Sequence, residues 1–409
     1  MTSKQIFCPI HGFIKITPLM KSIIDTPEFK RLHHLRQIGA AFLVFPSANH
    51  TRFEHSIGVS HLAGKIMKNL QVNQSELEIT DRLIELVRIA GLVHDIGHGP
   101  FSHLYDDIIT EYGFPHHEKR GITIFTSMIN KYNIKLEEEE INMIIEMIDP
   151  SDETKDNYIY QIVANKISSV DVDKIDYIQR DSYHLGLSVN NYDRLINMAR
   201  VVKYNDKVQL AWPEKIQQDI LTLFETRYRL HKNVYYHHAV KSAEFIIKEI
   251  LINIIEDPKN KILLNMSNDM IIYQNNTKET IKLLDNLNMR KFPKIIGEKV
   301  LCCTSTKENL KKVKSFEAKL DKLIIKLNSV NIKNTGWKKF TIGFISGNGE
   351  NPLKNVIYFN QKNINSGFTL QHYNSFMEPK NYKEFIYRVY IHDKKDFVYA
   401  ENQWSQLVS

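Results

Sequence analysis

AGLVHDIGHGPFSH, residues 90–103, is the stretch of sequence that decides the fold of this protein. It closes a segment, residues 80–93, in which apolar residues recur at the spacing of an amphipathic helix. His94 continues the apolar face of that helix and Asp95 follows it directly. An imidazole beside a carboxylate at a buried helix end is costly unless a partner compensates both groups. A divalent cation would be such a partner.

Two other segments place similar side chains on helix faces. His55 lies in register with Val59, Leu62 and Ile66, so it faces the core of its predicted helix. Asp173 lies in a predicted helix that contains VDVDKIDY. Either residue alone would more often be an ordinary buried polar group. With His94 and Asp95, however, they supply two imidazoles and two carboxylates, a donor set that suits Fe, Mn, Mg or Zn.

The order of these four residues, His…His-Asp…Asp, is the pattern of the HD superfamily of phosphohydrolases. A bare His-Asp dipeptide is weak evidence, but all four residues in order on predicted helix faces are strong evidence. A metal held in this way lowers the pKa of a coordinated water and neutralises charge on a phosphoryl oxygen. The pattern therefore predicts hydrolysis of a phosphoester or phosphoanhydride, without identifying the substrate.

The rest of the chain predicts a mainly α protein. We expect a helical HD domain at residues 1–255, a helical connecting region at 256–330 and a smaller C-terminal α+β lobe at 331–409. Within the first region, helices are expected at 52–70, 80–93, 117–130 and 161–181, one opening at 137–140, and one or two over 214–255. In the lobe, 337–347, 354–360 and 384–392 are rich in aromatic and β-branched residues and predict strands, and a helix is expected at 394–408.

Composition restricts the classes of protein without choosing among them. The 409 residues carry a net charge of +7, which favours anionic partners such as nucleotides and gives weak support to nucleic acid. Three cysteines provide no disulfide framework, so a reducing intracellular compartment, cytoplasm or nucleus, is expected. No signal peptide and no membrane-spanning stretch is evident.

Beyond the four metal-binding positions, the chain resembles the deoxynucleoside triphosphate triphosphohydrolases of the HD superfamily, and among them the vertebrate members that join a SAM domain to the HD domain. The resembling segments are PIHGFIKITP (9–18), IIDTPEFKRLHHLRQIG (23–39), FPSANHTRFEHSIGVSHLAG (45–64), IAGLVHDIGHGPFSH (89–103), NKISSVDVDKIDYIQRDSYHLG (165–186) and LFETRYRLHKNVYYHH (223–238). The sequence opens at the HD region, so we expect it to act without the SAM domain.

The resemblance implies a reaction that cleaves a dNTP into a deoxynucleoside and inorganic triphosphate. By position, His103 would be the general acid for the departing 5′-oxygen and Asp106 would orient it. His98 and His117 would complete the set of catalytic histidines. Because an alkoxide is a poor leaving group, donation of a proton should accelerate the reaction by roughly 10² to 10⁴-fold.

The resemblance also implies which residues bind the substrate. These are Gln37, Ile38, Arg52, Lys174, Tyr177, Asp181, Arg227 and Tyr235. Arg52, Lys174 and Arg227 would contact the triphosphate, since arginine suits bidentate recognition of phosphate. Asp181 would bind the sugar 3′-hydroxyl beside Tyr177. Ile38 and Tyr235 would leave no space for a ribose 2′-hydroxyl.

A last set of positions matches an activator site, at which GTP or dGTP would promote assembly of a dimer or tetramer. These positions are Asp25, Lys30, His33, Arg194 and Lys215. Lysine and histidine replace a glutamine and an arginine of the family at two of them, so the hypothesis is a weakened or altered site.

Two other functions remain open at the level of the sequence. The first is an HD phosphodiesterase or nucleotidase acting on another phosphoester, which the three triphosphate-directed cations disfavour. The second is a catalytically dead HD scaffold that binds nucleic acid, for which salt-sensitive affinity without turnover would be diagnostic.

Overall fold

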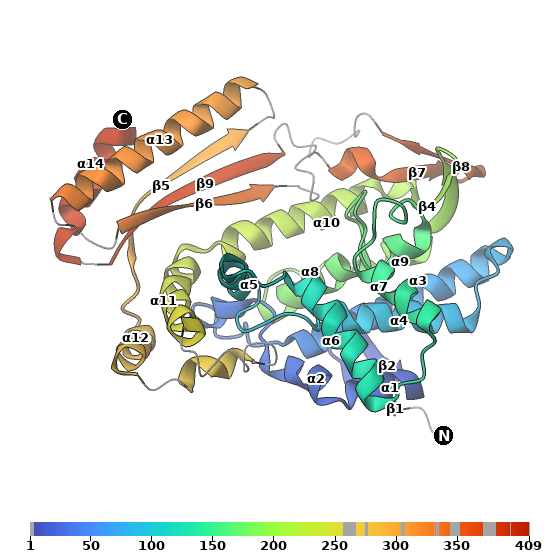
Figure 1. Cartoon of the computed structure of the whole chain (residues 1–409). Coiled ribbons are helices and arrows are strands. Elements are labelled where there is room, and N and C mark those ends of the chain that lie inside the picture. The colour runs from blue at the N-terminus through green and yellow to red at the C-terminus, as the bar shows by residue number, and fades with distance from the viewer. Residues whose placement is uncertain are drawn as a thin grey trace. The chain divides into compact units, whose positions relative to one another are not determined.

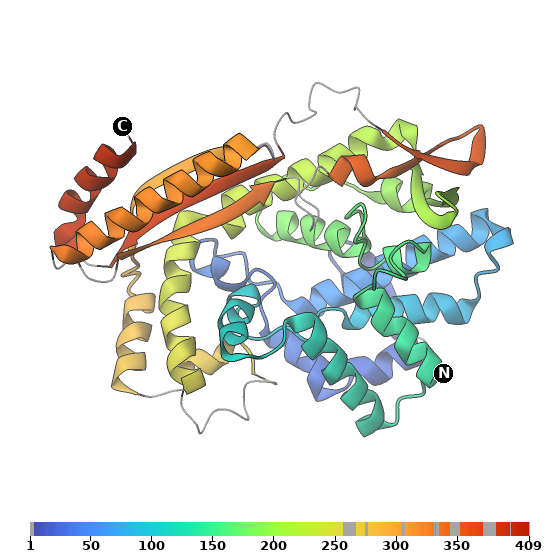
Figure 2. The same cartoon turned by 45° about the horizontal axis from the view of Figure 1, so that its top comes forward.

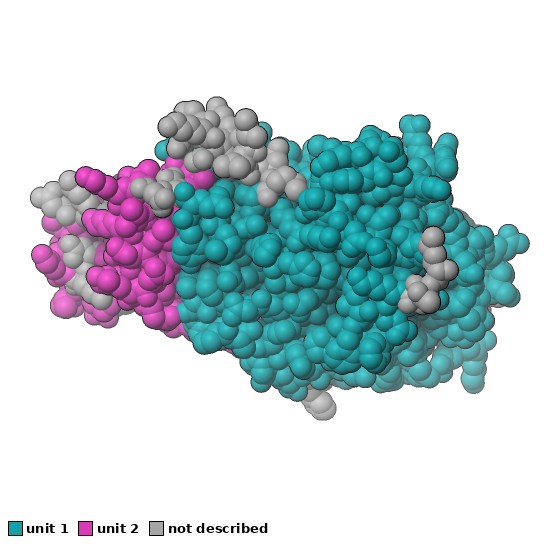
Figure 3. Space-filling view, turned by 90° about the horizontal axis from the view of Figure 1, so that it is seen from below, with its two compact units in different colours: residues 1–226, 255–274, 352–378 teal, residues 227–254, 275–351, 379–409 magenta. Residues whose placement is uncertain are grey.

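The protein was analysed as a computed structural model. It describes residues 4–256, 267–274, 277–303, 307–330, 332, 335–343, 352–370, 382–392 and 394–408. The chain forms two compact units, drawn in different colours in Figure 3. Unit 1 comprises residues 1–226, 255–274 and 352–378, and unit 2 comprises residues 227–254, 275–351 and 379–409. Each unit thus gathers segments that are distant in the sequence, whereas the division into three consecutive regions stays a prediction.

Unit 1 is built mainly from helices, as Figure 1 shows. In chain order its elements are β1 (Lys4–Cys8), β2 (Gly12–Ile16), α1 (Pro18–Ile24), α2 (Pro27–Lys30), η1 (Arg31–His34), η2 (Gly39–Leu43), α3 (Arg52–Asn73), η3 (Ser75–Leu77), α4 (Asp81–Val93), α5 (His103–Ile109), η4 (Thr110–Tyr112), α6 (His117–Tyr132), α7 (Glu138–Ile148), η5 (Tyr158–Gln161), α8 (Val172–His184), α9 (Asp193–Met198), β3 (Arg200–Tyr204), β4 (Lys207–Pro213), η6 (Glu214–Ile216), η10 (Asp269–Tyr273), η11 (Pro352–Asn355), β7 (Ile357–Asn360) and β8 (Asn363–Thr369). The long helices α3 and α4 pack closely together. A Cβ on Gly91 would lie only 3.2 Å from the backbone of Ser60, so the absence of a side chain allows this approach.

Most helices predicted in this unit are confirmed. Thr80 caps α4 by accepting a hydrogen bond from the Leu83 amide, and Glu137 forms a capping box at the start of α7. The prediction of a helix over 161–181 was wrong for the first half of that range. It begins only at Val172, because the Asp171 carboxylate caps it by accepting from the Lys174 amide.

A small closed barrel of four strands, in the order β3-β4-β7-β8, completes unit 1. Trp212 of β4 pairs in parallel with Tyr358 of β7, about 150 residues later in the chain. The strand predicted at 354–360 is therefore confirmed, but it joins the helical unit and not the sheet of the C-terminal lobe.

Unit 2 contains the three-stranded antiparallel sheet β5-β9-β6. Its strands are β5 (Lys294–Cys303), β6 (Thr335–Gly343) and β9 (Lys383–Ile391), and its helices are η7 (His231–Tyr235, a π-helix), α11 (His238–Glu256), α12 (Lys278–Asn288), α13 (Lys307–Ser329), η12 (Lys394–Asp396) and α14 (Phe397–Val408). The helix α10 (Gln217–Leu230) begins in unit 1, and its last residues belong to unit 2. Figures 1 and 2 show α13 and α14 against one face of the sheet, where Leu320 and Trp404 are buried. Tyr228 and Tyr236 pack on the other face against Phe340. The strand predicted at 337–347 is confirmed as far as Gly343, and its residues 344–347 lie outside the described residues. The strand predicted at 384–392 and the last helix are confirmed as β9 and α14.

Among the described residues, no helix combines the length and the apolar character that crossing a bilayer requires.

Candidate metal centre and active site

Three helix ends bring the four predicted metal ligands together. His55 lies in the first turn of α3, His94 caps the C-terminus of α4 with Asp95 next to it, and Asp173 lies in the first turn of α8. The His55 Nε2 atom is 3.0 Å from the Asp173 Oδ1 and 3.2 Å from the His94 Nε2. Oxygens of Asp95 lie 3.5 Å from each of the two imidazole nitrogens.

These separations fit one metal ion. Donor atoms bound at about 2.1 Å to a common ion lie about 3.0 to 3.4 Å apart in tetrahedral or octahedral geometry. The separations of 3.0 to 3.4 Å among His55, His94 and Asp173 match this requirement, and these three side chains form a compact donor group. Asp95 borders that group, with a different oxygen 3.5 Å from each imidazole. A carboxylate must be deprotonated to bind a metal ion. Although burial would raise it, the imidazoles of His55 and His94 hold the pKa of Asp173 well below its usual range.

Asp176, which was not predicted as a site residue, orients the proposed metal ligand His55. Its Oδ2 lies 2.8 Å from the His55 Nδ1, so it fixes the ring with Nε2 directed toward the other ligands. Its Oδ1 is 2.6 Å from the His11 Nε2, and Arg180 donates two hydrogen bonds to the carboxylate, at 2.8 and 2.9 Å. A Cβ on Gly58 would lie 2.0 Å from the same carboxylate, so only glycine admits this group against α3. The spacing of Asp176 and Arg180, i and i+4, was the available sequence signal.

We expect Asp176→Asn to weaken metal binding by about 10 to 100-fold, because the amide keeps the shape of the carboxylate but loses the charge that orients His55. Metal titration of the apoprotein measures the effect. Asp206→Asn, at a side chain that is 92% exposed, is the matched control. Equal metal affinity in wild type and Asp176→Asn, with both folded, would contradict the role.

A second polar cluster lies beside the metal centre. The Asp106 Oδ2 accepts a hydrogen bond of 2.5 Å from the His117 Nδ1, and Arg120 donates to its other oxygen. The His98 ring stacks on His117 with centroids 3.8 Å apart, and His103 lies 5.2 Å from His98. The structure thus brings all four predicted catalytic residues together. Within the described chain, Asp106 bonds directly to His117, whereas its action on His103 is that of a nearby negative charge.

Two glycines shape this cluster. A Cβ on Gly97 would lie 2.0 Å from the His117 carbonyl oxygen, so Gly97 permits α6 to begin against the turn that follows α4. A Cβ on Gly99 would lie 2.2 Å from the Tyr105 ring. Both glycines lie in the AGLVHDIGHGPFSH stretch, and close approach of α6 and of Tyr105 is the reason for them.

Arg52 and Asp95 connect the two clusters. Arg52 donates a hydrogen bond to Asp95 and another, at 2.9 Å, to the Ser102 hydroxyl. The His98 Nε2 lies 3.3 Å from the other Asp95 oxygen. Burial, then the charge of Arg52, lowers the pKa of His98 well below its usual range and that of His103 to about 4. The His103 side chain is nevertheless exposed in the structure.

Comparison with known proteins places the chain in a family. Residues 52–181 match the HD domain. The deoxynucleoside triphosphate triphosphohydrolase SAMHD1 homolog of Dictyostelium discoideum is 33% identical over 428 residues, covering 100% of this chain and 81% of the relative. The chain belongs to this family of HD-domain triphosphohydrolases. An HD domain-containing protein of Acanthamoeba polyphaga mimivirus is 35% identical, covering 96% of this chain and 93% of the relative.

The vertebrate members of the family match only in part. The deoxynucleoside triphosphate triphosphohydrolase SAMHD1 of Homo sapiens is 38% identical over 275 residues, or 61% of this chain and 44% of the relative. The matched part therefore covers less than half the length of that protein.

The substrate positions implied by the resemblance lie in both units. In unit 1, the buried Asp181 bonds to the His50 Nε2 at 2.7 Å, and the His50 ring stacks on His184. Tyr177 lies one turn before Asp181 on α8, and Lys174 reaches back to Asp171 at 3.0 Å. His50 was missed by the sequence analysis, although it lies two residues before Arg52.

The remaining predicted substrate positions are Gln37 and Ile38 in unit 1 and Arg227 and Tyr235 in unit 2. The Gln37 Oε1 is buried and has no hydrogen-bond partner among the described residues, and Ile38 precedes η2. Arg227 donates to the Gly343 carbonyl at 3.0 Å, and Tyr235 ends η7, both in unit 2. Contact of these residues with a substrate stays a prediction.

The positions implied for an activator fall in separate elements of unit 1. Asp25 pairs with Lys21 and lies 3.9 Å from Lys30. His33 stacks on Phe53 with ring centroids 3.6 Å apart. The other two are Arg194 of α9, which pairs with Asp219 at 2.8 Å, and Lys215 of η6.

Proposed function

We propose that this protein hydrolyses dNTPs to a deoxynucleoside and inorganic triphosphate, with one divalent ion held by His55, His94, Asp95 and Asp173. The observation that carries the proposal is the junction of the two clusters through Asp95, which is shared by the metal donor set and by His98. A site that activates water and a site that handles protons thus lie side by side. Membership in a family of named triphosphohydrolases supports the choice of substrate.

Each cluster has its own task in this proposal. When bound, a divalent ion lowers the pKa of a coordinated water and neutralises charge on a phosphoryl oxygen. Arg52, whose guanidinium borders both clusters through Ser102 and Asp95, would bind the phosphate oxygens. His103 donates a proton to the departing 5′-oxygen. The Asp106 carboxylate holds the Nδ1–H of His117, whose Nε2 lies 3.4 Å from the Glu118 carboxylate and would exchange protons in the site.

The metal donor set restricts the ion without choosing it. Nitrogen and oxygen donors without thiolate suit Fe, Mn, Mg or Zn. Elemental analysis of the protein as purified, followed by reconstitution of the apoprotein with each ion, identifies the one that supports turnover.

The decisive experiment is incubation with each dNTP and the matching NTP, followed by ion-pair chromatography. We expect deoxynucleoside and intact triphosphate, with the NTPs cleaved far more slowly. Pyrophosphate plus a monophosphate would indicate a different bond cleavage. Intact dNTPs under every metal and activator condition would overturn the proposal and favour an HD phosphodiesterase or a nucleic-acid-binding scaffold.

We also infer that GTP or dGTP promotes assembly of a homo-oligomer through Asp25, Lys30, His33, Arg194 and Lys215. Sedimentation velocity with and without each nucleotide measures this directly. A larger species on addition of GTP, lost in Asp25→Ala, is the expected result. An unchanged sedimentation coefficient with unchanged turnover would exclude nucleotide activation.

A further inference from the structure

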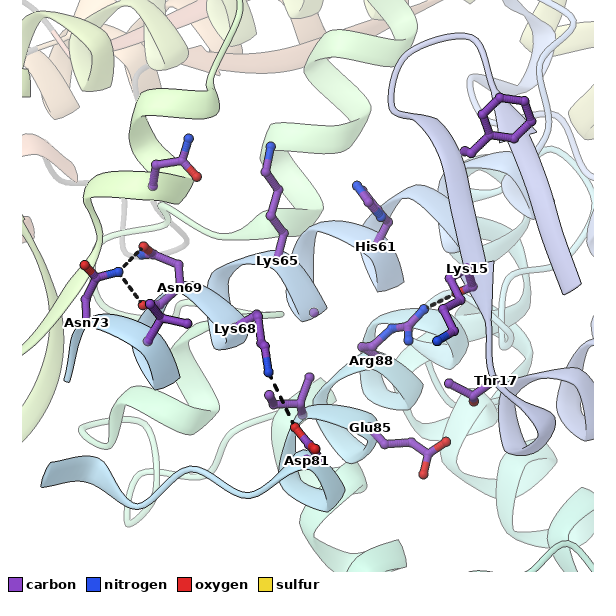
Figure 4. Close-up of a pocket in the computed structure, with 15 residues that line it drawn as sticks. Lys15, Thr17, His61, Lys65, Lys68, Asn69, Asn73, Asp81, Glu85 and Arg88 are labelled. Carbon is purple, nitrogen blue, oxygen red and sulfur yellow. Dashed lines mark hydrogen bonds and ion pairs between the residues drawn. The ribbon is translucent and has the colours of Figure 1, made fainter. Parts of the chain in front are cut away.

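A groove of about 920 Å³ lies in unit 1 between β2, α3 and α4 (Figure 4). It is separate from the metal centre, because its α3 side chains occupy another face of that helix. His61, Lys65 and Lys68 follow the spacing i, i+4, i+7, which places them in one stripe. Lys15 of β2 and Arg88 of α4 line the groove from the other elements, as Figure 4 shows.

Arg88 is a half-buried arginine without a carboxylate partner among the described residues. It donates one hydrogen bond, at 2.5 Å, to the Lys15 carbonyl. A Cβ on Gly64 would lie 2.7 Å from the Arg88 Cδ, so this glycine allows the arginine stem to lie against α3. Burial lowers the pKa of Arg88. A charged group in this position gains most from an anion that enters the groove.

The other cations are only partly balanced. Lys65 pairs with Asp193 at 2.5 Å, and Lys68 lies 3.7 Å from Asp81. The Lys15 ammonium has no hydrogen bond or ion pair with any part of the chain that the structure describes. Glu85, the other acid of the groove, forms an ion pair at 3.2 Å with Arg82, outside the groove lining. The groove therefore offers two cations, from Lys15 and Arg88, that lack a carboxylate partner.

The positive charges of the groove also lower the pKa of His61. Burial, and then the charges of His11, Lys65 and Arg88, lower its pKa to about 4. The imidazole is thus neutral at pH 7 and is available to donate or accept a hydrogen bond. Asn69 and Asn73 line the groove nearby and add amide groups.

We propose that this groove binds an oligophosphate anion, such as an inorganic polyphosphate or the phosphate chain of a nucleotide. Arg88 offers a planar fork for two phosphate oxygens, and Lys15, Lys65 and Lys68 supply point charges along a chain of phosphates. The inference does not rest on the proposed hydrolysis, since none of these residues belongs to the metal centre. It adds a phosphate site on another face of α3 from the one that carries His55.

The test is calorimetric titration of the full chain with sodium tripolyphosphate in EDTA, on an Asp173→Ala background. We expect the added pair Lys15→Gln and Arg88→Gln to weaken binding by about tenfold or more, because two charge-assisted contacts are lost. The matched control is Lys203→Gln with Lys207→Gln, which removes the same charge from the exposed β3–β4 hairpin. Lys15→Gln with Lys65→Gln is a second variant that spares Arg88, should its loss impair folding.

Equal affinity in the background, in both groove variants and in the control would overturn the proposal. A parallel titration with GTP distinguishes the source of the phosphates. Phe13 lines the groove with a ring that is 69% exposed and could stack on a base. If Phe13→Ala weakens the affinity for GTP but not for tripolyphosphate, the ligand is a nucleotide. If Phe13→Ala changes neither affinity, and the lysine and arginine variants weaken both affinities equally, the ligand is a bare polyphosphate.

Discussion

Replacing Asp173 by alanine is expected to reduce dNTP turnover by about 10³-fold or more and to remove tight metal binding. Asp173 is the proposed donor nearest to His55 and is the only one of the four that α8 supplies. Its loss therefore leaves only donors from the start of α3 and the end of α4. Loss of several kcal/mol of transition-state stabilisation corresponds to a factor of this size. Steady-state turnover and elemental analysis of the same preparation measure both effects.

Asp152→Ala is the matched control, because that side chain is 93% exposed and pairs only with Lys155 among the described residues. It should retain wild-type turnover and metal content. Near wild-type turnover in Asp173→Ala, with the metal still bound, would exclude this donor set.

His103→Ala is expected to lower kcat by roughly 10² to 10⁴-fold on dNTPs, with a smaller change in KM. The effect should shrink on p-nitrophenyl triphosphate, because p-nitrophenolate leaves without a proton. A positioning role alone would reduce turnover of both substrates alike. His116→Ala, at the exposed residue beside His117, is the control and should leave both rates unchanged.

The pH dependence provides a second readout of His103. In the free protein its pKa is about 4, lowered by burial and then by the charges of Arg52 and His117. A bound triphosphate neutralises Arg52, so the pKa in the complex should lie above 4. Since a general acid must be protonated, kcat should fall as pH rises through that higher value. This limb should vanish in His103→Ala, and a profile identical to wild type would contradict the role.

Part of the candidate site could be predicted from the local sequence pattern alone. The apolar spacing of two helices assigned His55 and His94 to inward faces, and Asp173 was placed on a further predicted helix. The beginning of α8 was misplaced by about ten residues, because capping by Asp171 competes with an apolar segment that periodicity alone extends backward.

By itself, the sequence determined the mainly α class, the helix faces that carry the metal donors and the resemblance that suggested the reaction. These features depend on the period of the helix and on residues close together in the chain. Only the tertiary structure decided that Asp176 supports His55, that His50 bonds to Asp181 across 131 residues, and that β7 returns to the helical unit to pair with β4. Such contacts join segments whose separation carries no local signal, so they are fixed by the packing of the whole core.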